Sequence, residues 1–380
     1  MANTNLSRAK NAKNDEFYTQ YADIQKEVNA YLEYDENVFR SKTVLLPCDD
    51  PEWSNFTKFF AQNFELFGLK KLISTSYAIE SKNLKQYYQP SLFETESPHF
   101  DRKKTRVRGK IFVLDHDTNR NGRIDIEDLE WNYLEGDGDF RSVEVKKLRD
   151  EADIIVTNPP FSLFREFLAW IMESKKMFLI LGNKNAVKYK DVFPLVQGNI
   201  LWVGTTSWAR EIYFDVPEEF KQSALAAGKD RTVVLVEGKH MARSQSVWYT
   251  NIEHGRRHLP LQLMSERDNI KFSKHKEIRG VGYQHYVNYD AIEVPYTDAI
   301  PDDYPGVMGV PLTFLDKYNP EQFEILGTSP QLAHPIVDYV EPDASYEKGG
   351  PACYLKVGEK RYRRLYDRIF IRHRKKEAVK

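Results

Sequence analysis

Hydrophobic and polar positions alternate in blocks along the first 255 residues, as they do in α/β proteins. Short apolar runs such as 43–47 are followed by polar turns, and stretches such as 15–34 and 54–67 carry apolar residues three or four positions apart. This strand–turn–helix–strand order predicts a doubly wound mixed α/β sheet. Further strands are predicted at 71–77, at 109–114 or 152–156, and at 177–181, 201–204, 231–236 and 246–250.

The pattern changes near residue 255, where the alternation of helices and strands stops. The remainder is rich in Pro, Tyr, His and charged residues and predicts a mainly irregular and β region over 256–380. We therefore expect one α/β domain over 15–255. Residues 1–14 predict a flexible basic arm, since they are polar and include Arg8, Lys10 and Lys13.

The most informative segment is a strand that ends in two prolines. Ile154–Val156 leads to Asn158, Pro159, Pro160 and Phe161, and a helix is predicted just beyond. Consecutive prolines fix φ and remove two backbone donors, so the turn is stiff. Asn158 Oδ1 and the Pro159 carbonyl are suited to accept both protons of an exocyclic amine, while Phe161 stacks on a planar base. The alternative is a proline-terminated loop with a buried Phe.

Composition bounds the class of protein. A chain of 380 residues, 41% hydrophobic and 13% aromatic, can form one large globular domain or two moderate ones. It has no secretory signal and no long apolar run, and its two cysteines lie far apart, which fits a reducing cytoplasm. We expect a cytoplasmic protein with no membrane association and no obligate protein partner.

Charge is balanced overall, with a net charge of −1, but it is uneven along the chain. Between Lys356 and Lys380 eleven Lys or Arg residues accompany three acidic ones, and Tyr362, Tyr366 and Phe370 lie among them. A basic segment with interleaved aromatic residues is suited to a phosphate backbone. A solvated terminal strand or tail is the alternative.

A second pattern, at 117–128, has the spacing of an EF-hand calcium loop. Asp117, Asn119, Asn121 and Asp128 fall at positions 1, 3, 5 and 12, and Gly122 falls at position 6. Position 12 is Asp where a bidentate Glu is usual, and no second loop is present to pair with this one. The sequence thus predicts a weak calcium site, with a Gly- and Asn-rich surface turn as the alternative.

Four segments, in this order, resemble one enzyme family: the adenine-specific DNA methyltransferases of the EcoRI type. They are Glu16–Thr19, Cys48–Pro51, Asn158–Phe161 and Trp248–Asn251. The resemblance implies the fold of S-adenosylmethionine-dependent methyltransferases, with S-adenosylmethionine as methyl donor and the N6 amine of adenine in double-stranded DNA as acceptor. It also implies that 256–380 is the target-recognition region with a basic tail. The stretch 79–131 departs from the family in being longer and more hydrophilic.

The chemistry of that reaction agrees with the corner at residue 158. N6 of adenine is a poor nucleophile because its lone pair is delocalised into the ring, and two acceptors on its protons aim the lone pair at the methyl group. A stacked helix hides N6, so the adenine has to be flipped out. Unstacking costs a few kcal/mol, which stacking on Phe161 partly offsets.

The resemblance also implies a set of donor-binding residues. Phe17, Tyr18 and Thr19 match the family segment that lines the methionine end of the donor. Asp49 and Asp50 follow the first strand, where a carboxylate is placed to bind the donor's amino or ribose groups, although an Asx turn capping the next helix is the alternative.

Asp139 and Phe140 are expected to border the adenine ring of the donor, with a plain loop as the alternative. The usual glycine-rich signature is absent from 45–56.

Two rival interpretations stay open. One is an RNA base or protein-glutamine methyltransferase with the same tetrapeptide, and the other is a non-catalytic, calcium-sensitive DNA-binding module.

Overall fold

A computed structural model describes residues 18–49, 54–78, 95, 99–215, 221–222 and 233–374, with only the backbone of Tyr18 and Ile126. The predicted arm at 1–14, Phe17, Asp50 and the last six residues lie outside this part of the chain. The chain divides into two compact units. The first comprises Met1–Val192 and Leu201–His254, and the second comprises Phe193–Ile200 and Gly255–Lys380.

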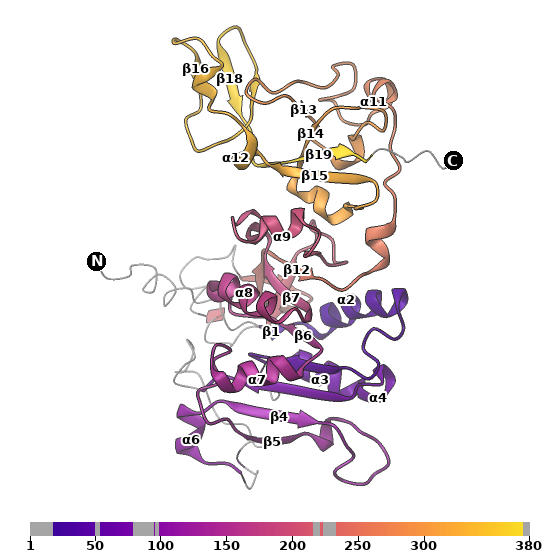
Figure 1. The fold of residues 1–380 in the computed structure, drawn as a ribbon, viewed down its shortest axis with the longest axis vertical. Coiled ribbons are helices and arrows are strands. Elements are labelled where there is room, and N and C mark those ends of the chain that lie inside the picture. The colour runs from indigo at the N-terminus through magenta and orange to yellow at the C-terminus, as the bar shows by residue number, and fades with distance from the viewer. Residues whose placement is uncertain are drawn as a thin grey trace, which may run out of the picture. The chain divides into compact units, whose positions relative to one another are not determined.

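The first unit is built on an eight-stranded mixed sheet with the order β5-β4-β3-β2-β6-β7-β12-β8 (Figure 1). Its central strands β3, β2, β6 and β7 are parallel, and the strands on either side pair antiparallel. The predicted doubly wound mixed α/β sheet is confirmed. The strands are β2 (Thr43–Leu46), β3 (Lys71–Ser76), β4 (Lys110–Leu114), β5 (Glu130–Tyr133), β6 (Ile154–Thr157), β7 (Met177–Asn183), β8 (Trp202–Val203) and β12 (Ser246–Thr250).

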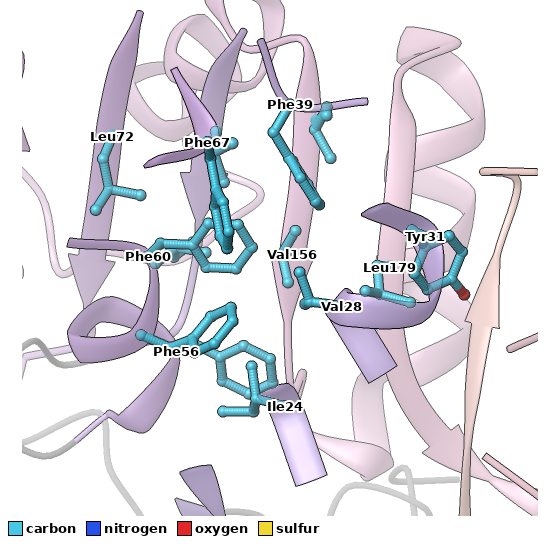
Figure 2. Packing of buried hydrophobic residues seen from close by; sticks show 14 of the residues in the cluster. Ile24, Val28, Tyr31, Phe39, Phe56, Phe60, Phe67, Leu72, Val156 and Leu179 are labelled. Atoms are coloured by element: carbon cyan, nitrogen blue, oxygen red, sulfur yellow. The ribbon is translucent and has the colours of Figure 1, made fainter. Parts of the chain in front are cut away.

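Three helices cover one face of this sheet: α2 (Tyr21–Tyr34), α3 (Asn55–Gln62) and α4 (Phe64–Phe67). Figure 2 shows Phe56 and Phe60 of α3 packed among side chains from alternate positions of the strands, such as Val156 and Leu179. Ser54 caps α3, since its hydroxyl accepts a hydrogen bond from the Phe56 amide. The predicted helix at 54–67 is present in two pieces, α3 and α4.

The opposite face of the sheet is covered by α7 (Val143–Glu151) and α8 (Phe164–Ser174). Gly182 of β7 marks the contact with α8, because a Cβ atom at this position would collide with the Phe164 ring. Glycine is therefore required for close packing here. A further helix, α6 (Arg102–Val107), lies in the stretch 79–131 that departs from the family pattern.

A second, four-stranded antiparallel sheet has the order β1-β9-β11-β10. The strand predicted at 231–236 belongs to this sheet, where it forms a hairpin with β11. Glu237 and Gly238 both have positive φ in the two-residue turn, as such hairpins require. The strands are β1 (Tyr18–Thr19), β9 (Ile212–Asp215), β10 (Val233–Val236) and β11 (Lys239–Ser244).

The second unit contains a four-stranded sheet, β13-β14-β19-β15, and a three-stranded sheet, β16-β18-β17. Its strands are β13 (Ile292–Glu293), β14 (Met308–Pro311), β15 (Phe323–Thr328), β16 (Ser345–Tyr346), β17 (Tyr354–Lys356), β18 (Arg361–Arg364) and β19 (Arg368–His373). Its helices are short, namely α9 (Phe193–Gln197), α11 (Glu266–Phe272) and α12 (Ser329–Leu332). Within the described ranges of both units, no helix has the length and apolar character needed to span a bilayer.

Candidate active site

The candidate site lies where the strand order of the main sheet reverses. From β2 the chain continues to β3 on one side, while β6 pairs with β2 on the other. In open α/β sheets, ligands bind at such a reversal point, outside the carboxyl ends of the strands. The turn Pro47–Asp49 follows β2 and the segment Asn158–Phe161 follows β6, so the topology brings these two predicted segments together.

A buried carboxylate joins the two segments. The Thr157 hydroxyl lies 2.6 Å from Asp49 Oδ2 and 2.5 Å from the Pro47 carbonyl oxygen, and the Ser54 hydroxyl donates to Asp49 Oδ1 at 2.7 Å. Asp49 is 6% exposed and Thr157 is fully buried. The carboxylate is thus engaged by the protein itself, which favours a positioning role for Asp49 over the predicted contact with the donor.

The proline-built corner is ordered by its own hydrogen bonds. The Pro160 carbonyl accepts the Leu163 amide at 2.9 Å, which closes the short 3₁₀ turn Phe161–Leu163 that leads to α8. The Pro159 carbonyl, by contrast, accepts no hydrogen bond within the part of the chain that the structure describes. Asn158 and Phe161 are partly buried. The corner therefore holds an amide side chain, a carbonyl oxygen and a ring in one short segment.

The small sheet borders this corner. The Phe161 ring lies 6.3 Å from the ring of Phe214 in β9, and Phe214 pairs with Thr19 of β1. Asn55, the first residue of α3, donates its side-chain amide to the Thr19 carbonyl at 2.8 Å. Since Ser54 binds Asp49, these contacts form a closed ring around the ends of β2 and β6.

Thr19 also offers an unused polar atom. Its hydroxyl oxygen is buried and has no hydrogen-bond partner in the described residues. A buried hydroxyl left in this state costs roughly 1–3 kcal/mol, so a bound polar ligand is a natural partner. Tyr18 pairs with Asp215 through its backbone.

The loop that carries Asp139 reaches the ends of β2 and β3. Cys48 Sγ lies 3.5 Å from the Tyr77 hydroxyl, and burial raises the pKa of both groups, with a further contribution from the negative charge of Asp139. Arg141 binds Asp139 through two nitrogens, at 2.6 and 2.9 Å. Burial of Asp139 opposes ionisation, but the hydrogen bonds and charge of Arg141 outweigh it and lower the pKa of the carboxyl. Asp139 is thus a charged group beside the predicted donor turn.

Phe140, the neighbour of Asp139, is fully buried. Its ring packs edge-on against Phe167 and Trp170 of α8, with centroid distances of 5.0 and 5.7 Å. It has no exposed surface to offer to an adenine ring, so its burial favours a packing role. Trp248 is likewise fully buried, against Phe56, and is part of the core.

The predicted calcium site is not supported. Asp128 is buried, and its oxygens accept the amides of Thr118, Asn119 and Asp125. The other predicted ligands also face backbone amides, since Asp117 accepts from Asn121 and Gly122, Asn119 from Asn121, and Asn121 from Arg123. Among the described residues no group of three or more His, Cys, Asp or Glu is arranged to hold a metal. The loop is a hydrogen-bonded turn between β4 and a 3₁₀ turn, not a helix–loop–helix.

Sequence reasoning missed several residues that shape the site. Thr157 ends a strand of apolar residues, so the hydrophobic pattern does not mark it as a site residue. Its position directly before Asn158 could have indicated its role. Phe214 becomes a neighbour of Phe161 only through the pairing of strands far apart in sequence. Arg141 lies two residues after Asp139 in the sequence, but its bond to that carboxylate depends on the loop conformation.

Known proteins resemble this chain over most of its length. The family described as adenine-specific methyltransferase EcoRI matches residues 5–374. The type II methyltransferase M.EcoRI of Escherichia coli is 39% identical over 321 residues, covering 84% of this chain and 88% of that protein. M.MpnI of Mycoplasma pneumoniae is 34% identical over 363 residues, covering 95% and 96%. No solved structure matched the chain. The chain therefore belongs to the EcoRI family of adenine-specific methyltransferases.

Proposed function

We propose that this protein methylates N6 of adenine at a specific site in double-stranded DNA, with S-adenosylmethionine as donor. The observation that carries the proposal is the Asn158–Phe161 corner at the reversal point of the sheet, tied through Thr157 and Asp49 to the turn after β2. The type II methyltransferases among its relatives support DNA as the acceptor. We further propose a cytoplasmic enzyme of a restriction–modification or host-protection system.

The acceptor is held by the corner itself. Asn158 Oδ1 and the Pro159 carbonyl each accept one proton of the N6 amine, and Phe161 stacks on the extruded base. Two acceptors on the protons favour a pyramidal nitrogen and stabilise the positive charge that develops on it. Holding the amine in this orientation removes much of the entropic cost of the encounter, and no covalent enzyme intermediate is needed.

The proposed partners of the donor lie around the ends of β2 and β3. The buried Thr19 hydroxyl has hydrogen-bonding capacity to spare, and Asp139 supplies an ionised carboxylate. Tyr18 belongs to the same strand as Thr19. Phe17 and Asp50 stay in the proposed set from the sequence, whereas Asp49 and Phe140 are assigned to positioning and packing. When bound there, S-adenosylmethionine supplies an activated methyl group.

An Asn158→Ala variant tests the role of the corner. We expect it to abolish methyl transfer to DNA while calorimetry shows that S-adenosylmethionine still binds. Equal turnover by the variant and the wild type would refute the assignment. Modification-sensitive long-read sequencing of DNA from a methylation-free host that expresses the protein would identify the base and the target site.

A second assay separates the classes of acceptor. Tritiated donor is incubated with the protein and with DNA, RNA or protein in parallel. We expect label only in DNA. Label in RNA or in a glutamine-containing protein would replace the proposed reaction with that of another enzyme using the same tetrapeptide.

A further inference from the structure

The second unit carries one aromatic side chain in an unusual setting. Of the three aromatic residues in the basic segment, Tyr362 and Phe370 are buried, whereas Tyr366 is 88% exposed. Tyr366 is the most exposed of the large hydrophobic side chains in the described residues. It lies in the turn between β18 and β19. A packing role for Tyr366 is therefore excluded, and its ring is available to a ligand.

The basic residues around this turn divide into two groups. Several are already neutralised: Lys360 pairs with Asp343, Arg368 with Glu293 and Arg372 with Glu324, at 2.6 to 2.8 Å. Arg361 and Arg363 are exposed and form no ion pair with any residue that the structure describes. Uncompensated guanidinium groups of this kind favour a polyanionic partner.

Arg361 and Arg363 share one face of β18, because alternate residues of a strand point the same way. Tyr362, between them, points into the core formed with Ile336 and Tyr354. Tyr366 follows Arg363 by three residues, a span of at most about 10 Å along an extended chain. Two cations and an exposed ring are thus presented within a short stretch of backbone.

The turn is held firmly on both sides of Tyr366. The Leu365 amide donates to the Cys353 carbonyl at 2.9 Å, and the Arg368 amide donates to the Ser329 hydroxyl at 2.9 Å. The Arg368 guanidinium, paired with buried Glu293, also donates to the Tyr366 carbonyl at 3.3 Å. The exposed ring therefore sits on an ordered backbone, so little conformational entropy remains to be lost when a ligand binds.

We infer that Tyr366, Arg361 and Arg363 form a DNA contact in which the two guanidinium groups bind backbone phosphates and the ring lies against a base or sugar. This inference rests on the proposed function, because it takes DNA as the polyanion. Phosphate binding positions the duplex without reading its sequence. The aromatic ring adds contact with a sugar or the exposed edge of a base, so it contributes affinity that is independent of charge.

The test is DNA binding by the full-length protein without donor. Fluorescence anisotropy with a labelled mixed-sequence duplex is measured over a range of salt concentrations. Arg361→Ala with Arg363→Ala should weaken binding and reduce the slope of log affinity against log salt by roughly two. Tyr366→Ala should weaken binding about 5-fold at every salt concentration, which corresponds to about 1 kcal/mol, whereas Tyr366→Phe should bind like the wild type.

Matched controls keep the result specific. Arg372→Ala removes an arginine that Glu324 already neutralises, and Phe272→Ala removes another exposed ring of the same unit, so both should bind DNA like the wild type. Unchanged binding by the Tyr366→Ala and double arginine variants would overturn the inference, even if the wild type methylates DNA. Loss of binding would support it even if methyl transfer failed. If the wild type bound an RNA duplex of the same sequence as tightly, and the same variants weakened that binding equally, the assignment to DNA would be overturned.

Discussion

Thr157 donates a hydrogen bond to Asp49 at 2.6 Å, and this contact joins the two turns on which the proposed reaction depends. Asp49 belongs to the turn after β2, on the donor side of the site. Thr157 directly precedes Asn158, which is proposed to grip the acceptor. The buried Thr157 hydroxyl, which also contacts the Pro47 carbonyl, therefore fixes the position of one turn relative to the other.

Replacing Thr157 by Val should test this link, because Val keeps the shape and removes the hydroxyl. A hydrogen bond to a charged group is worth about 1.5–3 kcal/mol, so the free energy of unfolding should fall by that amount in denaturant titrations. We also expect kcat to fall more than the affinity for S-adenosylmethionine, since the acceptor amine loses its alignment. Thr157→Ser should restore both. A Val variant with the stability and kcat of the wild type would show that the contact is dispensable.

Removal of the Phe161 ring should weaken capture of the flipped base. We expect Phe161→Ala to lose about 1–3 kcal/mol of binding to a duplex with 2-aminopurine at the target base, as for other base–aromatic contacts. The rise in 2-aminopurine fluorescence on extrusion provides the measurement. Phe161→Tyr keeps the ring and serves as the control. A wild-type fluorescence response in the Ala variant would contradict the stacking role.

Arg141 should set the pH range of donor binding. Because Arg141 lowers the pKa of Asp139, that carboxyl stays ionised in moderately acidic solution. The contribution of the ionised Asp139 to donor binding is complete above about pH 4, the ordinary pKa of Asp. It is lost as the pH falls through the depressed pKa of this carboxyl. Arg141→Gln should raise that pKa, so the acidic limb of the calorimetric binding curve for S-adenosylmethionine should move to higher pH.

The matched control for this shift is Arg165→Gln. Arg165 of α8 also pairs with an aspartate, Asp191, at 2.8 Å, but both of these side chains are exposed to solvent. Its removal should leave the donor-binding curve in place. Coincident curves for the wild type and the Arg141→Gln variant would argue against a contact between Asp139 and the donor.

Calcium should have no effect on stability. Asp128 holds its loop together by accepting backbone amides, so Asp128→Ala should lower the melting temperature equally with added calcium and with a chelator. The wild type should melt at the same temperature in both conditions. A calcium-dependent increase in the wild-type melting temperature, absent in Asp128→Ala, would restore the calcium hypothesis.

Local pattern predicted much of the fold and part of the site. Apolar runs between polar turns located the central strands, and the proline pair located the corner after β6. The local pattern could not predict contacts between segments that lie far apart in the sequence. Nothing near β9 indicates that it pairs with β1 in a separate sheet, and nothing near Phe140 indicates that α8 covers its ring. Likewise, the residue spacing at 117–128 indicates which side chains carry oxygen atoms. It does not indicate that backbone amides donate hydrogen bonds to those oxygens.

The turn after β2 has one further property that composition conceals. Cys48 adopts a φ of +72°, the left-handed conformation that glycine usually supplies and that other residues tolerate only where their surroundings hold them. A search of the sequence for glycines would thus miss this bend, although its backbone has the conformation that glycine normally adopts. Cys48→Gly is accordingly a substitution that the turn itself would accept, because glycine adopts this φ without strain.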